Sequence, residues 1–420
     1  MHDRAQAPST ALPAITVPAR STLAGLAIGL VLGIAASRDA GGPLAKLLAL
    51  VTPFGALWLR ALEMTILPLA VSLLVIGIVH TVAAARAGAM ARRTLGLFVA
   101  VLLAGTLMAA VVTPLLLDVW PVPAQAVAAL TNAAPRAAPA LPRLGAFLAS
   151  LVPANIVAAA AADGILPVLS FFALFAAALT RLAEAQRHAL MLLFEGLAGA
   201  AMVMIGWVLA LAPLGVFALS FAVAAAAGGA AIGLLAHYML VVSAIGAVVM
   251  AAGCGLAICG GGLAPLAFAR AMLPVGAVAL STQSSLASLP AMLGACRRLG
   301  LREDSAGFVL PLAVALLRAT GPAMNLAVAI YVARLSGIAL SPSMMASGVI
   351  VACLTTLGAP SISGTVSYIS SIAPIALAMG LPVAPLALLV AVEMLPDLIR
   401  TLGNVVMDVA AAALVDRATG

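Results

Sequence analysis

The chain has 420 residues, of which 65% are hydrophobic and only 8% are charged. So few charged groups cannot cover the surface of a water-soluble protein of this length, which excludes an ordinary soluble globular fold. The net charge of +7 does not indicate a nucleic-acid partner, because the basic residues lie in short gaps between apolar runs, where they act as topology signals.

The apolar runs are continuous and far longer than the alternating segments of about ten residues that build a membrane β-barrel. We therefore predict an all-α polytopic membrane protein in contact with lipid. In chain order, simple spans are expected at residues 22–36, 48–80, 94–117, 151–180, 190–222 and 231–260. A linker rich in Pro and Ala, residues 118–150, is predicted to lie outside the membrane.

Three basic gaps fall on one side of the membrane if each run crosses once, and the positive-inside rule places that side in the cytoplasm. Both termini are then expected in the cytoplasm, with the chain in a bacterial inner membrane. The gaps contain Arg4 and Arg20, then Arg86, Arg92 and Arg93, then Arg181 and Arg187.

Apolar segments after Pro265 are broken by Ser, Thr, Gly and Pro at residues 281–290, 320–325 and 355–365. Irregular polar backbone at membrane depth is tolerated only where it is buried in protein or lines a watery cavity. The pattern favours two re-entrant hairpins around a binding site at the midplane. The alternative is ordinary Ser/Thr helix packing with proline kinks.

The segment 388–416 is apolar enough to cross the membrane, yet four ionisable residues lie in its interior. A charge at the bilayer centre costs about 3 kcal/mol or more, so these groups must face a protein interior. Their spacing predicts one helical stripe within an arc of roughly 80°. The stripe is formed by Glu393, Asp397, Arg400, Asn404 and Asp408. A salt-bridged stripe that only holds helices together is the alternative to a functional site.

The chemistry of the stripe suits an acidic amino acid. Arg400 offers a planar fork for a carboxylate and is predicted to be a buried cation that only the substrate neutralises. Asp397 can receive an ammonium group, and the oxygens of Asn404 and Asp408 suit a hard cation such as Na⁺. Together these groups predict a symporter.

The stripe, with Thr401 and Val405, resembles the final helix of the dicarboxylate/amino acid:cation symporters, the glutamate transporter family. Residues 281–290 and 358–364 resemble its two hairpin tips. Further similar motifs are Leu59, Arg60, Glu63, Met64, Pro68 and Leu69, then Val152, Pro153 and Asn155, then residues 212–217. The resemblance implies eight transmembrane helices, two re-entrant hairpins and a homotrimer.

The resemblance also implies a static scaffold, residues 1–93 and 151–222, and a mobile transport unit that moves like an elevator, residues 94–117 and 223–420. Arg400 would bind the side-chain carboxylate of the substrate and Asp397 its amino group. Further substrate contacts would come from Thr401, Asn404, Ser284, Ser285, Gly358, Ser361 and Ser363. Cation contacts would come from Asn404, Asp408, Asn325 and Met324.

Helix 7 departs from the family pattern, because no carboxylate stands near Met324 and Asn325, where the family usually has a sodium ligand. Arg318 lies in the same stretch and Glu393 replaces a usual Asp. Glu393 is predicted either to exchange a proton or to pair with Arg318 as a fixed substitute for a cation. We therefore expect coupling to a proton or a single Na⁺, with no other cofactor.

Two other functional classes are alternatives to a symporter. An intramembrane enzyme would need a Ser/His pair or an HExxH motif, which the sequence does not contain, and His2, His80, His188 and His237 are expected at span ends or in loops. A non-transporting sensor related to the family is the other possibility, favoured by the altered helix 7.

Overall fold

The structure is a computed structural model that describes residues 19–38, 42–85, 88–124, 149, 151–162, 164–358 and 365–419. These residues form helices and no strand, as the composition predicts. Seven helical segments of the described chain are long and apolar enough to cross a membrane. Most of the predicted linker 118–150 and the second hairpin tip lie outside the described residues.

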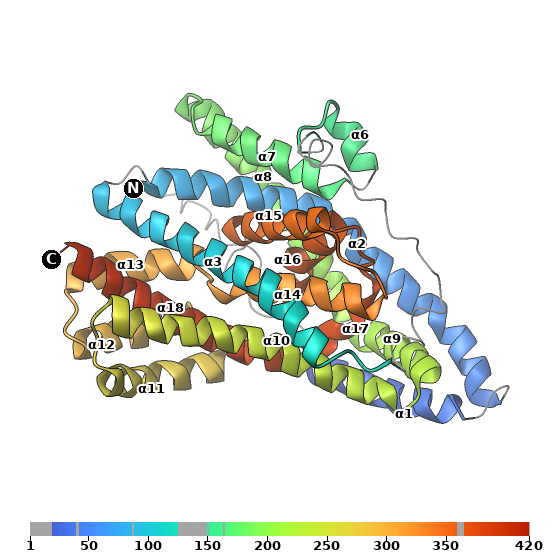
Figure 1. The fold of residues 1–420 in the computed structure, drawn as a ribbon. Helices are drawn as coiled ribbons and strands as arrows, with labels where there is room; N and C mark the ends of the chain where they lie inside the picture. The colour runs from blue at the N-terminus through green and yellow to red at the C-terminus, as the bar shows by residue number, and fades with distance from the viewer. Residues whose placement is uncertain are drawn as a thin grey trace, which may run out of the picture.

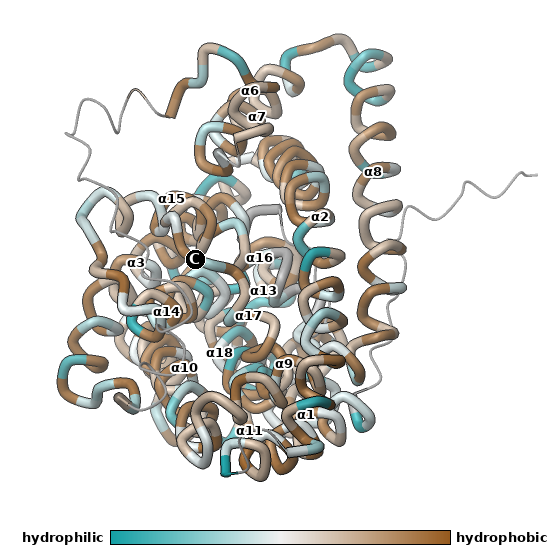
Figure 2. The backbone as a smooth tube through the Cα atoms, turned by 90° about the vertical axis from the view of Figure 1, so that its right-hand side faces the viewer, coloured by the Kyte–Doolittle hydropathy of each residue, from teal (hydrophilic) through white to brown (hydrophobic). Residues whose placement is uncertain are grey.

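The outward faces of the helices are apolar, as lipid contact requires. Helix α3 (Ala89–Val119) exposes one large hydrophobic side chain every four residues, which places them on one face. Figure 2 shows that α2 (Pro43–Ala85) and α8 (Glu184–Ala210) are also predominantly hydrophobic along their lengths. The exposed large hydrophobic residues of α3 are Val99, Leu103, Leu107, Val111, Leu115 and Val119.

Helix α2 has 43 residues and therefore a length of about 65 Å, so it must tilt strongly in a hydrocarbon layer of about 30 Å. It contacts α7 (Ile165–Leu179), α8 and α9 (Ala212–Ala227), and α9 packs along α1 (Ala19–Ala36) (Figure 1). The short helix α6 (Ile156–Ala161) precedes α7 and is capped by the side chain of Asn155.

The remaining helices surround α18 (Met394–Thr419), which contacts α10, α11 and α13, with α14 packed between α3 and α10 (Figure 1). Their bounds are α10 (Ala230–Gly255) with a π turn (Leu256–Gly260), α11 (Pro265–Thr282), α12 (Leu289–Arg298), α13 (Glu303–Leu316), α14 (Thr320–Leu335), α15 (Pro342–Gly358), α16 (Thr365–Ala378), α17 (Ala384–Leu389) and a 3-10 turn (Val390–Val392).

The two expected hairpins correspond to the pairs α11–α12 and α15–α16, whose arms contact each other. The first hairpin reverses at Gln283, which adopts a left-handed conformation with φ 51° and caps α11. The helices and the two hairpins of the described residues thus agree with the predicted all-α polytopic membrane fold.

Three helix breaks follow from proline. A proline cannot donate a hydrogen bond to the carbonyl four residues earlier, and its ring clashes with that carbonyl. Pro213 therefore separates α8 from α9, Pro322 separates α13 from α14 at Arg318, and Pro396 gives the 3-10 turn before α18. The predicted spans 190–222 and 388–416 are wrong as single helices, because each is interrupted near a proline. The predicted span 151–180 also differs, since it contains the two helices α6 and α7.

Candidate functional site

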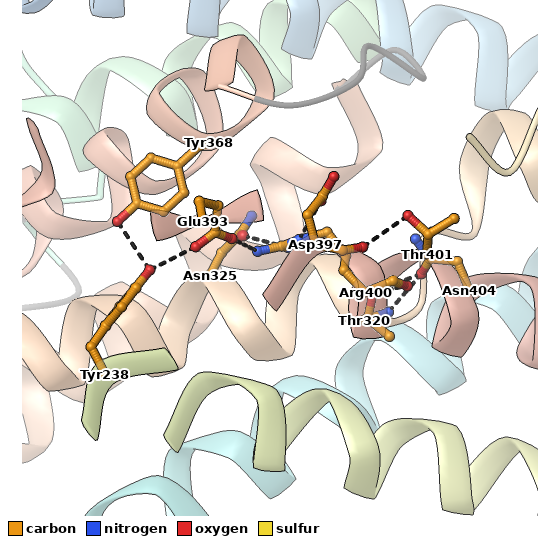
Figure 3. A network of polar contacts seen from close by, with 9 residues as sticks. All are labelled: Tyr238, Thr320, Asn325, Tyr368, Glu393, Asp397, Arg400, Thr401 and Asn404. Carbon is orange, nitrogen blue, oxygen red and sulfur yellow. Dashed lines mark hydrogen bonds and ion pairs between the residues drawn. The ribbon is translucent and has the colours of Figure 1, made fainter. Parts of the chain in front are cut away.

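All three nitrogens of the Arg400 guanidinium are bound by the chain itself (Figure 3). Nη2 lies 2.8 Å from Oε1 of Glu393, Nε lies 3.3 Å from Oδ1 of Asp397, and Nη1 donates to Oδ1 of Asn325 at 2.8 Å. The prediction that only a substrate neutralises Arg400 is therefore wrong for this state. Because the guanidinium is only 8% exposed, its charge requires such partners.

Glu393 is held on both carboxylate oxygens. While Oε1 accepts from Arg400, Oε2 accepts a hydrogen bond of 2.7 Å from the hydroxyl of Tyr238 on α10. The Tyr238 hydroxyl also lies 3.2 Å from that of Tyr368 on α16 (Figure 3). Glu393 therefore pairs with Arg400, and the predicted pair with Arg318 stays a prediction. The cluster joins α10, the second hairpin and α18.

Asp397 begins the first turn of α18 and is the more accessible of the two acidic partners. Its side chain is 15% exposed, against 7% for Glu393, and its distance to Arg400 is longer. Thr401, one turn later, donates to the backbone carbonyl of Asp397 at 2.9 Å. The predicted receptor for an ammonium group is thus partly open, and Thr401 fixes the local helix geometry.

Asn404 fastens α18 to the start of α14. Its Oδ1 accepts from the backbone N–H of Thr320 at 3.0 Å and from the Thr320 hydroxyl at 2.8 Å. Gly403 makes this approach possible, because a Cβ there would lie 2.5 Å from the Thr320 methyl. The amide oxygen of Asn404 is therefore used for helix packing, and the role of Asn404 as a cation ligand stays a prediction.

Asp408 is the unusual residue of the site. It is 1% exposed, and neither carboxylate oxygen has a hydrogen-bond partner among the residues that the structure describes. A buried carboxylate without a partner is strongly destabilising unless it is neutralised. Its chemistry fits an oxygen-liganded cation such as Na⁺, although the described residues contain no cluster of three acidic, His or Cys side chains.

Helix 7 of the family pattern corresponds to α13 and α14, and its break lies at Arg318, not at Met324 and Asn325. Those two residues belong to the regular part of α14, where Asn325 binds Arg400 and Met324 packs on Gly246. Neither is placed as a cation ligand. Arg318 is half-buried, has φ 34° and acts electrostatically on Asp397 and Arg400.

The first hairpin tip does not bond to Arg400 within the described residues. Ser284 and Ser285 are half-buried, and their hydrogen bonds stay within the turn, where Ala287 and Ser288 are their partners. Gly358 ends α15, and Ser361 and Ser363 lie outside the described residues. Their predicted substrate contacts remain predictions.

The sequence did not reveal Tyr238, Tyr368 or Thr320 as parts of the site, because a single polar residue in an apolar helix has no distinctive spacing. His237 is also misplaced by the sequence reading. It is buried within α10, where its ring nitrogens lie 3.1 Å from the Tyr331 hydroxyl and from the Trp120 carbonyl.

Residues 19–418 match the family described as the sodium:dicarboxylate symporter family. An excitatory amino acid transporter of Caenorhabditis elegans is 35% identical over 155 residues, 36% of this chain and 30% of that protein. The human excitatory amino acid transporter 2 is 34% identical over 155 residues, 36% of this chain and 26% of that protein.

A C4-dicarboxylate transport protein of Brucella anthropi is 32% identical over 139 residues, 33% of this chain and 31% of that protein. Each aligned stretch therefore spans less than a third of the relative. The family match, in contrast, covers nearly the whole chain and agrees with its helical architecture. The chain belongs to the sodium:dicarboxylate symporter family.

Proposed function

We propose that this protein is a secondary active symporter of acidic solutes, not an enzyme. The observation that carries the proposal is the buried guanidinium of Arg400, held by two carboxylates at the start of α18. A planar cation in a site of low dielectric binds carboxylates strongly, and an acidic solute has the group needed to replace one of its present partners. Relatives named as transporters of excitatory amino acids and C4-dicarboxylates support this solute class.

Within that class, aspartate or glutamate is the proposed substrate in preference to succinate or malate. Asp397 is the partner with the longer contact and the greater exposure, so it is free to turn toward an ammonium group. A plain dicarboxylate would bring a second negative charge to the same carboxylate without relief, which is unfavourable in a buried site.

Coupling to a cation is proposed because Asp408 is a buried carboxylate without a partner. One Na⁺ bound there, with the backbone carbonyl of Asn404, would neutralise it. Family membership supports the remaining parts of the proposal: movement of the α3 and α10–α18 unit against a scaffold of α1, α2 and α7–α9, a homotrimer, and a location in a bacterial inner membrane.

A non-transporting sensor is the second candidate, favoured by one observation. Because the chain itself occupies every nitrogen of Arg400, the site is satisfied without a solute. Transport and sensing differ in turnover, since a sensor binds its ligand without moving it across the membrane.

The decisive experiment is uptake by purified protein in liposomes, with radiolabelled aspartate, glutamate, succinate and malate. We expect uptake of aspartate or glutamate and a weaker effect of succinate as competitor. Arg400→Gln should abolish uptake, because it removes the carboxylate-binding fork, while Arg187→Gln, a change in the first turn of α8, should not. Binding without uptake would instead favour the sensor, and uptake unaffected by Arg400→Gln would refute the proposed site.

A further inference from the structure

Glu393 occupies the position on Arg400 that an incoming carboxylate must take. The contact is short, 2.8 Å at Nη2, and the Glu393 side chain is only 7% exposed. A substrate carboxylate that binds Nη2 displaces Glu393 from its cation. Glu393 is then a buried carboxylate with one remaining donor, the Tyr238 hydroxyl, and such a group is far more stable when it is protonated.

We infer that Glu393 is the proton-binding residue of this transporter and that it takes up one proton whenever a substrate carboxylate replaces it on Arg400. The inference rests on the proposed function, since it needs an acidic substrate at Arg400. The proton comes from the aqueous phase on the side of entry. It returns to water on the opposite side, when the substrate leaves and the Glu393–Arg400 pair forms again.

The charge count of the cluster supports one proton for each acidic amino acid. With Arg318 and Arg400 protonated and Glu393 and Asp397 ionised, the formal charges of the empty cluster cancel. Aspartate or glutamate brings one net negative charge. A proton on Glu393 restores neutrality, which a buried site requires. A dicarboxylate, which brings two negative charges, would need two protons.

Of the charged and titratable groups in this cluster, Glu393 is the one whose protonation state changes when substrate binds. On α18, Arg400 and Asp397 face it; on α10 and α16, Tyr238 and Tyr368 face it. Arg400 keeps its proton at any accessible pH. Asp397 retains Arg318 as a nearby cation when Arg400 turns to the substrate. The two tyrosines are hydrogen-bond donors near neutral pH.

The two tyrosines also connect proton binding to the second hairpin. Tyr368 lies on α16, and its hydroxyl contacts that of Tyr238 at 3.2 Å. When Glu393 is ionised, Tyr238 must donate to it; when Glu393 is protonated, Tyr238 is released to donate to Tyr368. The protonation state of Glu393 therefore changes a contact between α10 and one arm of the hairpin.

Two measurements test the inference separately from the proposed function. Exchange of labelled aspartate at equal pH on both sides of the liposome tests transport alone. Uptake driven by an inward proton gradient, with equal sodium concentrations on both sides and the membrane potential clamped, tests the proton. We expect the unchanged protein to exchange labelled aspartate and also to take up aspartate in response to the proton gradient. Its Kd for aspartate should fall about tenfold for each unit of acidification between the ionised and protonated limits, because binding one substrate binds one proton.

Glu393→Gln should lose the accumulation driven by the proton gradient, and its Kd for aspartate should not change with pH. Glu393→Asp, which retains the carboxylate, should recover the pH response. The matched control is Glu195→Gln, since Glu195 lies on α8 outside the cluster. If Glu393→Gln fails to fold, Tyr238→Phe replaces it: loss of the donor should move the pH profile of Kd to higher pH.

Accumulation that persists in Glu393→Gln, or a Kd that is independent of pH in the unchanged protein, overturns the inference. Exchange by the unchanged protein without a response to the proton gradient also overturns it and leaves the proposed function intact. The absence of exchange and binding for every acid overturns the proposed function, and this inference with it.

Discussion

At the scale of the residue, Asp408 has the least favourable environment in the site. Its two carboxylate oxygens are buried and have no hydrogen-bond partner among the described residues. If a sodium ion neutralises this charge, removal of the carboxylate should weaken the response to sodium specifically. We expect Asp408→Asn to raise the sodium concentration for half-maximal uptake about tenfold or more, because even residues one shell beyond a metal ligand change affinity by that factor.

Sodium activation in liposomes at fixed pH measures this effect. Asp416→Asn is the matched control, because Asp416 lies near the end of the same helix but pairs with Arg302 at 2.8 Å. Sodium activation that is unchanged in Asp408→Asn would exclude Asp408 from the cation site and leave its burial unexplained.

At the scale of the element, the contact of α1 with α9 depends on glycines four residues apart. A Cβ on Gly29 would meet the hydroxyl oxygen of Ser220 and the carbonyl of Phe217, and one on Gly33 would lie 2.6 Å from the Cβ of Ala224. Such small residues let two membrane helices approach closely. Any side chain at these positions must separate them.

Gly29→Ala should therefore lower the thermal unfolding midpoint of the purified protein, since overpacking costs about 1–3 kcal/mol. Gly96→Ala is the matched control in α3, because a Cβ there has nothing within 4 Å; the better helix propensity of alanine should leave its midpoint equal or higher. Equal destabilisation by the two changes would argue against close packing of α1 on α9.

Individual helices also show which features of the fold and site the sequence could predict and which it could not. Charges inside an apolar span are conspicuous, so Asp397, Arg400 and Asp408 could be identified without a structure. The break in helix 7 was misplaced, because the residue that causes it, Pro322, acts on the carbonyl of Arg318 four residues earlier. The pairing of Glu393 with Arg400 depends on the local turn before α18, which a uniform helical stripe does not represent.

At the scale of the whole molecule, basic residues gather at the end that contains the C-terminus. Arg93 at the start of α3 donates to the Ala418 carbonyl, Arg302 pairs with Asp416, and Arg417 donates to Gly260. Arg93 belongs to a gap predicted to be cytoplasmic. The C-terminus of α18 therefore lies beside a positive-inside signal.

We accordingly expect a reporter fused after residue 420 to be active in the cytoplasm and one inserted in the linker 118–150 to be active outside. Paired fusions to alkaline phosphatase and green fluorescent protein make the measurement, and each reporter serves as the control for the other. An external C-terminus would require a different number of crossings and would contradict the eight-helix topology.

The mutual neutralisation of Glu393, Asp397, Arg318 and Arg400 has an electrical consequence. Moving one unit of charge through a potential of about 100 mV changes its energy by about 2.3 kcal/mol. Since the four formal charges of the empty cluster cancel, this part of an unloaded carrier can reorient without work against the field. The membrane voltage would then act on whatever occupies Asp408, and the return step of the cycle would need no second ion at Arg400.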